Sequence, residues 1–600
     1  MRTKKASDLV RLAILGLILF GFLARVWRIG YQSLWLDEAL SVTFAGASLP
    51  QLLTNLAAQD IHPPLYYVLL HFWMRLAGRG EFSVRFLSLL LGLPSVPATY
   101  ALAHALFDTG EPAIGPEGNR LERRVGDRAS AIGLIGAFLV AFSPFLVYYS
   151  QEARMYSALV TFSVLSSYAL WKYLARLDPR WLGGYVAFTA ALLYTQYFGG
   201  LVVLAQVLYL LGLLTRRRGA AVRGLAGVVI VGACYLPWAP SALSQVLRMY
   251  HAPDFWQGQL SLTFLLEHIF GAFALGQYAA IGHYLPVAVV AALVLLGGLA
   301  LLARRAFARG GGELFLLIYL LVPLVVLYAI LAKNPKFTER YLIMIVPPFY
   351  LVFALALVDL TRWIECRAKG AIRRAGLLAP LAIAVVFLGV SFGQLWQVYY
   401  GPGYRKEDNR GAASYISQHY QPGDVVILMM DPYSFPYYSD GRIPAVPLQP
   451  GDNMEAGANG LNAILTGHKR AWLLLWNADF ADPTGFVRNA LDSAYPQTQV
   501  AQFNGLGLKL FAIDHPPHFS VRTTPEHAEP VDFGNRLQLL GYDLPGATVS
   551  AGQTGTITLY WKALRSLDRD YIVSLRLTDG RFYYWRNDRR PAADTFPTTS

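Results

Sequence analysis

The chain has 600 residues, of which 55% are hydrophobic and only 15% are charged, and its mean hydropathy is +0.37. This composition is rare among soluble domains, and the two cysteines, Cys234 and Cys366, offer no plausible disulfide framework.

The formal net charge of +13 would suit nucleic-acid binding, but the basic residues are concentrated in short loops between apolar runs. That distribution is the positive-inside pattern of cytoplasmic loops, so nucleic acid is the poorer interpretation. The residues concerned are Arg120, Arg123, Arg124, Arg128, Arg216, Arg217, Arg218, Arg223, Arg304, Arg305, Arg309, Arg362, Arg367, Lys369, Arg373 and Arg374.

Apolar runs of about twenty residues recur between Val10 and Val398, and this is the length that an α-helix needs to cross the hydrocarbon of a bilayer. The first run follows a basic N-terminus and has no cleavage site, so we expect an uncleaved anchor with its N-terminus inside. We expect residues 183–214 to form two short helices with a hinge at Gly199-Gly200, or alternatively one long tilted helix that would reverse the topology downstream. The basic loop at 216–223 favours two helices. We predict about eleven spans, near 10–29, 83–107, 129–149, 156–175, 183–197, 199–214, 224–241, 284–303, 313–332, 342–361 and 376–397.

The apolar stretch Leu65–Ala77 is short for a membrane span. A span there would place the arginine-rich loop 108–128 outside, against the charge rule. A helix that lies in the membrane interface keeps every later basic loop inside. It also suits the aromatic residues of this stretch, which favour the headgroup level: Tyr66, Tyr67, Phe72 and Trp73. The external segments are then expected at 30–82, 150–155, 196–198, 242–283, 333–341 and everything after 398.

The first external loop, 30–82, contains two groups of polar residues. Asp37 and Glu38 follow the first span, where a carboxylate pair costs free energy unless it is solvated, paired or bound to a metal. Capping of a short helix is an equally good account of this pair. Asp60 and His62 precede two prolines, which restrain the histidine to extended geometry at the start of the interfacial helix. For His62, capping or core packing is the default interpretation and catalysis is the alternative.

Two further external segments carry charged residues. Glu152 and Arg154 lie between two spans with almost no loop, so they sit at the membrane surface or face an internal cavity. They either form a local ion pair or, in the functional interpretation, Glu152 faces the same pocket as Asp37. The segment 333–341 holds three cations, which opposes the positive-inside bias and favours a bound anion, for which phosphate is suited to Lys and Arg donors.

These segments together resemble the protein-mannosyltransferase/aminoarabinose-transferase-like glycosyltransferases of the GT-C fold. The resemblance covers about residues 8–400, and the four motifs occur in the same order and on the same predicted side. The segment Tyr194–Phe198 also looks like an external segment of this family, although members often have histidine where Gln196 stands. The motifs are Asp37-Glu38, His62-Pro63-Pro64-Leu65, the run from Tyr149 to Tyr156, and Arg340-Tyr341.

The resemblance implies an inverting transfer of a sugar from a polyprenyl-phosphate donor on the outer face of the membrane. Asp37 and Glu38 would be the catalytic carboxylates, with Asp37 taking the proton of the acceptor hydroxyl. No separate general acid is needed because phosphate is a good leaving group. The leaving phosphate would be held by Lys336, Arg340 and Tyr341, with help from Arg154. The candidates for sugar hydroxyls, acceptor orientation or a metal are Glu38, Asp60, His62, Tyr66 and Glu152. No cofactor is fixed by these residues, and a divalent metal stays open because metal dependence varies within this fold.

The last two hundred residues read as water-soluble domains. A helix at 410–420, a strand at 425–429 and a second buried strand at 471–475 predict a small α/β domain over 401–515. Asp431, Tyr437 and Tyr438 follow the first strand, where they either form a plain loop or line a carbohydrate-binding edge. From 529 to 600, alternating strands predict a β-sandwich module with few strands, so this module is either small or incomplete.

Three classes of function compete for this sequence. A transporter or flippase of envelope glycan precursors would usually show internal repeats and polar residues in mid-membrane, whereas here they concentrate at external ends. A membrane anchor displaying carbohydrate-binding domains would explain the tail but not Asp37-Glu38 or the external cations. The favoured class is a multi-pass glycosyltransferase of the cytoplasmic membrane, with its C-terminal domains outside. Its acceptor would be a glycan, a lipid or a protein.

Overall fold

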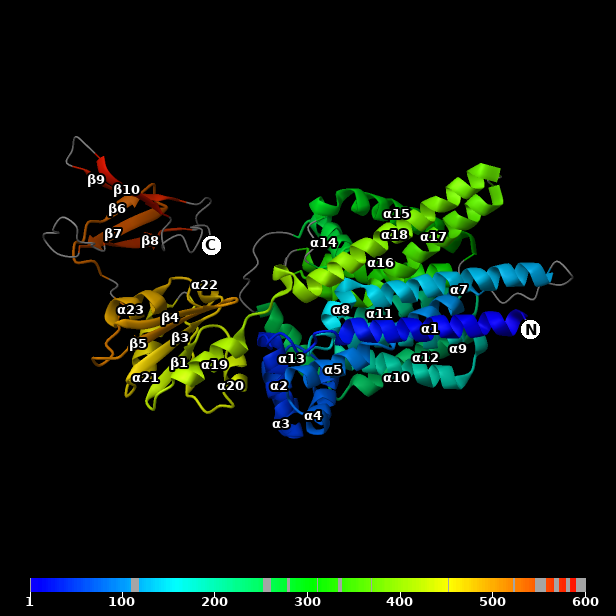
Figure 1. The fold of residues 1–600 in the computed structure, drawn as a ribbon. Coiled ribbons are helices and arrows are strands. Elements are labelled where there is room, and N and C mark those ends of the chain that lie inside the picture. The colour runs from blue at the N-terminus through cyan, green and yellow to red at the C-terminus, as the bar shows by residue number, and fades with distance from the viewer. Residues whose placement is uncertain are drawn as a thin grey trace. The chain divides into compact units, whose positions relative to one another are not determined.

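The structure is a computed structural model, and its fold is shown in Figure 1. It divides into two compact units, each described by itself. The first unit comprises residues 1–32 and 40–405, and the second comprises residues 33–39 and 406–600. The described residues are 2–108, 118–251, 260–277, 281–309, 311–332, 337–367, 370–451, 453–521, 524–544, 557–565, 571–578 and 583–589.

The first unit is helical throughout its described residues. Its helices in chain order are α1 (Arg2–Val26), α2 (Leu36–Gly46), which starts in the second unit, α3 (Leu49–Gln59), α4 (Leu65–Ala77), α5 (Glu81–Gly92), α6 (Ser95–Phe107), α7 (Gly118–Phe142), α8 (Pro144–Ser150), α9 (Tyr156–Arg176), α10 (Pro179–Thr195), α11 (Gly199–Leu213), α12 (Arg218–Tyr235), α13 (Ala239–His251), α14 (Leu262–Ala274), η1 (Ile281–Tyr284), α15 (Leu285–Arg309), α16 (Gly311–Leu331), η2 (Glu339–Ile345), α17 (Val346–Arg367), α18 (Gly370–Tyr400) and η3 (Pro402–Tyr404).

The predicted multi-pass membrane protein is confirmed. Among the described residues, seven helical segments are long and apolar enough to cross a membrane, and α7 with α8 makes an eighth if this pair, bent by 53°, is one span. Helices α9, α10 and α11 occupy the remaining predicted spans, with 21, 17 and 15 residues. Two short helices, α10 and α11, form where the sequence left one long helix as the alternative. The predicted span 83–107 is divided into α5 and α6 at Leu93 and Pro94, since proline donates no backbone hydrogen bond.

The helices of this unit pack closely around α17, whose window in the span Glu339–Arg367 is 94% buried. A glycine in α15 permits the contact with α17, because a Cβ on Gly298 would lie 2.7 Å from the carbonyl oxygen of Val352. A partly buried ion triad also joins three helices. Asp359 of α17 accepts from Arg128 of α7 at 2.9 and 3.1 Å and from Arg305 of α15 at 2.5 Å. Shared between two cations, the carboxylate fixes the relative register of these helices.

Helix α4 covers the same residues as the predicted interfacial helix, Leu65–Ala77. Five of its side chains, Tyr66 and Tyr67 among them, are buried, whereas Phe72 and Leu76 are exposed. This one-sided burial is what an amphipathic helix requires. Its position at the membrane interface stays a prediction.

The second unit contains the predicted α/β domain. The strands are β1 (Asp424–Leu428), β2 (Ala445–Pro447), β3 (Arg470–Leu475), β4 (Gln497–Phe503) and β5 (Leu506–Ala512). They form one sheet in the order β2-β1-β3-β5-β4, parallel among the first three strands and antiparallel at β5 and β4. One face is covered by α21 (Met454–Leu465) and α23 (Phe486–Ala494), and the other by α19 (Asn409–His419) and α20 (Ser434–Tyr438). The remaining short helix is α22 (Ala478–Ala481).

The chain continues into antiparallel strands. A three-stranded sheet has the order β6-β7-β8, formed by Val531–Phe533, Leu537–Asp543 and Thr558–Ala563. A two-stranded sheet pairs β9 (Val573–Thr578) with β10 (Tyr583–Arg589). The closure of these strands into a sandwich stays a prediction.

Candidate functional site

A buried carboxylate organises the loop between α3 and α4. Asp60 is 4% exposed, and its carboxylate accepts from the amide of Ile61 at 2.6 Å and from the hydroxyl of Tyr67 at 2.5 Å. The Nδ1 atom of His62 lies 2.8 Å from the same carboxylate. Burial alone would raise the pKa of Asp60, but His62, Arg154 and the Tyr67 hydroxyl hold it well below its usual range. Asp60 is therefore a permanent negative charge at physiological pH.

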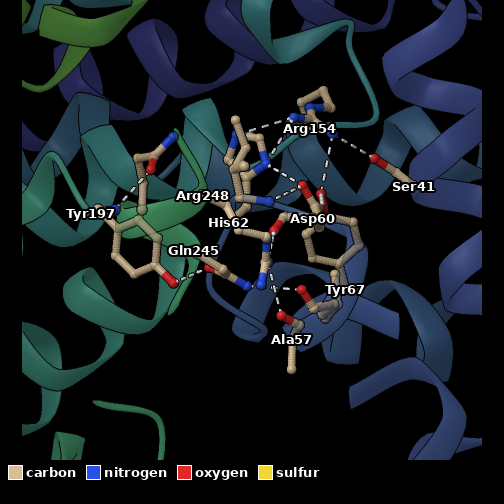
Figure 2. A network of polar contacts seen from close by, with 12 residues as sticks. Ser41, Ala57, Asp60, His62, Tyr67, Arg154, Tyr197, Gln245 and Arg248 are labelled. Atoms are coloured by element: carbon tan, nitrogen blue, oxygen red, sulfur yellow. Dashed lines mark hydrogen bonds and ion pairs between the residues drawn. The ribbon is translucent and has the colours of Figure 1, made fainter. Parts of the chain in front are cut away.

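A buried guanidinium from another part of the chain completes this loop. Arg154 is 2% exposed, and its Nη1 donates to the hydroxyl of Ser41 at 3.1 Å and to that of Tyr67 at 3.2 Å. Its Nη2 lies 3.4 and 3.5 Å from the ring nitrogens of His62. Figure 2 shows Arg154, His62, Asp60 and Tyr67 turned toward one another. The buried guanidinium is thus bonded to neutral hydroxyls and lies near the charge of Asp60, which offsets part of its desolvation.

The other predicted residues of these two segments support the same network. The hydroxyls of Tyr66 and Ser88 lie 2.8 Å apart, and Ser88 donates to the backbone carbonyl of Arg154 at 3.1 Å. Glu152 is 1% exposed, and its carbonyl accepts from the amide of Arg154 at 2.7 Å. The structure therefore brings together the side chains of Asp60, His62 and Arg154, and Ser88 links Tyr66 to the backbone of Arg154. Glu152 is buried two positions before Arg154 in the chain.

The sequence analysis missed two residues of α13 that hold the end of α3. Gln245 donates to the carbonyl of Leu56 at 2.8 Å, and Arg248 donates to the carbonyls of Ala57 and Asp60 at 2.9 and 3.1 Å. The last carbonyls of a helix carry partial negative charge, so these donors suit them. Figure 2 shows both side chains reaching toward Ala57. Their spacing of three residues on one helix was the available signal, but it did not reveal the partner.

The predicted external segment at Gln196 connects to α13. The hydroxyl of Tyr197 donates to the amide oxygen of Gln245, and Trp238 donates to this hydroxyl at 3.1 Å. Gln196 uses its side-chain oxygen to accept from the amide of Tyr197 at 2.7 Å, so here it supports local chain geometry.

The predicted phosphate-binding residues are placed in part. Arg340 begins η2 next to α9, with its guanidinium 5.5 Å from the ring centroid of Tyr156, which is a cation–π contact. Tyr341 packs against Phe198, with ring centroids 4.8 Å apart. Lys336 lies outside the described residues. Arg340 is therefore held beside Tyr156, which is the first residue of α9 and follows Arg154 by two positions.

The carboxylate pair Asp37-Glu38 begins α2 and groups with the second unit. Glu38 is fully buried, and Lys406 lies 3.0 Å from its carboxylate. Helical continuity places Asp37 one turn before Ser41, the residue that accepts from Arg154. Glu38 therefore forms an ion pair inside the fold, and Asp37 lies beside it in the first turn of α2.

A divalent cation was left open by the sequence. Among the described residues, no three His, Cys, Asp or Glu side chains form a group that could hold a metal ion. The chain's own side chains in that part of the structure therefore supply no complete set of metal ligands.

Comparison with known proteins defines the fold. No known sequence family matches the chain, and no curated protein matches it. Among solved structures, the chain is similar to ArnT from Cupriavidus metallidurans in the apo state, with 15% identity and a TM-score of 0.52 over 84% of this chain and 98% of that chain. The same enzyme bound to undecaprenyl phosphate matches over the same shares with a TM-score of 0.51 and 15% identity. The archaeal oligosaccharyltransferase AglB from Archaeoglobus fulgidus, in complex with an inhibitory peptide and a dolichol-phosphate, matches at 11% identity with a TM-score of 0.51 over 84% and 74% of the two chains. The chain therefore has the GT-C fold of these membrane glycosyltransferases.

Proposed function

We propose that this protein is a membrane glycosyltransferase that moves a monosaccharide from a polyprenyl-phosphate donor to an acceptor hydroxyl, with inversion, on the outer face of the cytoplasmic membrane. The observation that carries the proposal is the fold, which matches 98% of an ArnT chain that was solved with undecaprenyl phosphate. The buried network around Arg154 is consistent with it, because it places charged and polar side chains at the ends of helices rather than in mid-membrane.

The reaction requires a base and a site for the leaving phosphate. In our proposal, Asp37 takes the proton of the acceptor hydroxyl as its oxygen attacks the anomeric carbon. The bond from that carbon to the phosphate oxygen breaks, and the electron pair leaves with the lipid phosphate. Arg340 and Lys336 offset its growing charge, with Tyr341 as a further donor. Arg154 contributes a fixed positive charge, since its guanidinium is already bonded to Ser41 and Tyr67.

The remaining predicted residues have supporting roles. Asp60 and Tyr66 hold the loop on which His62 is presented, and the His62 side chain is 13% exposed. His62 and Glu152 then fit the orientation of a sugar or acceptor hydroxyl. Glu38 is assigned no proton transfer, because its carboxylate is bonded to Lys406.

Reconstituted protein incubated with polyprenyl-phosphate sugars tests this function. Lipid phosphate should be released only when an acceptor is present, and an Asp37→Asn variant should lose on the order of 1,000-fold in kcat, as expected from removal of a general base. Asp440→Asn is the matched control, because this exposed aspartate lies in the same unit and pairs only weakly with Arg442 at 3.4 Å. Equal rates for wild type and Asp37→Asn would refute the base assignment.

A second experiment addresses the phosphate site. Arg340→Ala should weaken donor binding, seen as a raised KM for the donor, more than it alters acceptor preference. Arg442→Ala is the control, because its side chain is 81% exposed. An unchanged donor KM in Arg340→Ala would exclude this arginine from the phosphate site.

A further inference from the structure

The segment Ser33–Ala39, which carries Asp37, is bound on both sides by the α/β domain. Leu34 is fully buried. Its amide donates to the hydroxyl of Tyr438 at 2.6 Å, and its carbonyl accepts from the side chain of Asn409 at 3.1 Å. Tyr438 ends α20 and Asn409 begins α19. Both backbone groups of one residue are therefore held by side chains of the second unit, which defines the path of the chain just before Asp37.

A second set of contacts holds the two ends of the segment. The hydroxyl of Ser33 donates to the carbonyl of Glu407 at 2.5 Å. At the other end, Lys406 donates to the fully buried carboxylate of Glu38 at 3.0 Å, and the lysine side chain is itself only 9% exposed. Trp476, directly after β3, donates to the Glu407 carboxylate at 3.0 Å. Because buried charge-assisted bonds are strong and directional, this set restricts the segment more than surface contacts would.

The contacts gather near the carboxyl ends of β1 and β3. Strand β2, the next strand in the chain, lies on one side of β1, and β3 lies on the other side. The strand order therefore reverses between β1 and β3, and open α/β sheets bind ligands at the carboxyl ends of the strands at such a switch point. Non-glycine residues in the left-handed region follow both strands, namely Met430 with φ 72° and Asn477 with φ 43°. Such strain persists where the surrounding structure imposes it, often at functional sites.

Asp431, at this same edge, is buried and accepts from the amides of Tyr433 and Ser434 at 2.9 and 3.0 Å. Burial raises the pKa of Asp431, and the negative charge of Asp37 raises it further. Asp37 is therefore one of the charges that act on Asp431.

We infer that the α/β domain is a working part of the catalytic machinery, in which Lys406, Asn409 and Tyr438 are positioning residues for Asp37. This inference rests on the proposed function. It gives the α/β domain the role of positioning Asp37, in place of displaying a carbohydrate-binding surface. A base held by its neighbours keeps the geometry needed for proton transfer, and a misplacement of about 1 Å costs on the order of 100-fold in rate.

Kinetics of Lys406→Met in the full-length protein test the inference. We expect kcat to fall on the order of 100-fold while the donor KM changes by less than about twofold, because the phosphate-binding residues are untouched. Lys406→Arg should recover most of the rate, since it restores a cation to Glu38. Lys509→Met is the matched control, because this lysine also pairs with a carboxylate of the domain, at 2.7 Å from Asp492. Equal kcat in Lys406→Met and Lys509→Met would overturn the inference.

Hydrogen exchange provides a readout that does not depend on turnover. In Tyr438→Phe, the amide of Leu34 loses its acceptor, so peptides covering residues 33–39 should exchange at least about tenfold faster than in the wild type. Peptides of the sheet should be unchanged, which excludes general unfolding. An active wild type with unchanged exchange in Tyr438→Phe would refute the positioning role alone. Faster exchange in Tyr438→Phe, together with no sugar transfer by the wild-type protein, would instead refute the proposed function, and the assignment to catalysis with it.

Discussion

Replacing Asp60 by asparagine keeps the shape of a buried side chain and removes its charge. The wild-type carboxylate bonds to Ile61 and Tyr67 and lies 2.8 Å from His62. Without this charge, the buried guanidinium of Arg154 loses a nearby counter-charge. Breaking a buried pair from one side typically costs 3–5 kcal/mol, and because asparagine still accepts hydrogen bonds we expect about 3 kcal/mol.

The expected shift in melting temperature follows from the size of the first unit. With an unfolding entropy of about 2.1 cal/mol/K per residue over the roughly 400 residues of this unit, 3 kcal/mol corresponds to about 4 °C. Tryptophan fluorescence during thermal unfolding of detergent-solubilised protein measures it. Asp178→Asn is the control, because Asp178 caps α10 through the amide of Arg180, and asparagine caps as well as aspartate.

Two results would refute this reasoning. A melting temperature of Asp60→Asn within 1 °C of the Asp178→Asn value would mean that the charge of Asp60 contributes little to the network. An increase would mean that the network is strained and is relieved by neutralisation. Either outcome would also remove the structural support for presenting His62 at a fixed position.

Other changes have expected effects of known direction. Gly312→Ala should lower the free energy of unfolding by about 2 kcal/mol or more, because the new Cβ on α16 would lie 2.2 Å from the carbonyl oxygen of Leu106 in α6. In the control Gly297→Ala the new Cβ has no atom within 4 Å, so this variant should melt no earlier than the wild type. Arg248→Met should cost about 1 kcal/mol and speed hydrogen exchange at the end of α3; unchanged exchange there would refute its capping role. The pKa of Asp60 is lower in the folded protein than its ordinary value of about 3.9 in an unfolded chain. The contribution of Asp60 to the free energy of unfolding is therefore complete above about pH 3.9 and is lost as pH falls through the folded pKa. The melting temperature of the wild type should then show no dependence on the titration of Asp60 between pH 8 and about 4. Loss of the wild-type advantage over Asp60→Asn already at pH 6 would contradict that sign.

Much of the helical fold could be predicted because apolar length and turn residues act locally. Helix α4 has the predicted bounds Leu65–Ala77, since prolines precede it and Gly78, with φ 85°, follows it. The break between α10 and α11 falls at 196–198, next to the glycine pair that predicted a hinge. The bend of 53° between α7 and α8 was not predicted, although Pro144 stands at that point. Its apolar neighbours made the segment resemble a continuous span.

The site was less accessible to sequence reasoning because its partners are distant in the chain. Capping or core packing was the default interpretation of His62; the following helix has no side-chain cap, and the largely buried ring lies 2.8 Å from the carboxylate of Asp60. Arg154 meets Tyr67 across 87 positions, and Gln245 meets Leu56 across 189. Local patterns identify such residues as polar and placed at helix ends. They do not identify which remote carbonyl or hydroxyl each will meet.

The binding of residues 33–39 to the C-terminal unit has a consequence for the order of events during synthesis. Lys406 follows Glu38 by 368 positions, so its codon is translated roughly 20–70 s later at typical elongation rates of about 5–20 residues per second. Until then the membrane helices can insert, but the turn that carries Asp37 lacks its partners. In a nascent chain, or in one truncated before Lys406, the segment that carries Asp37 therefore lacks the buried partner that this structure gives to Glu38.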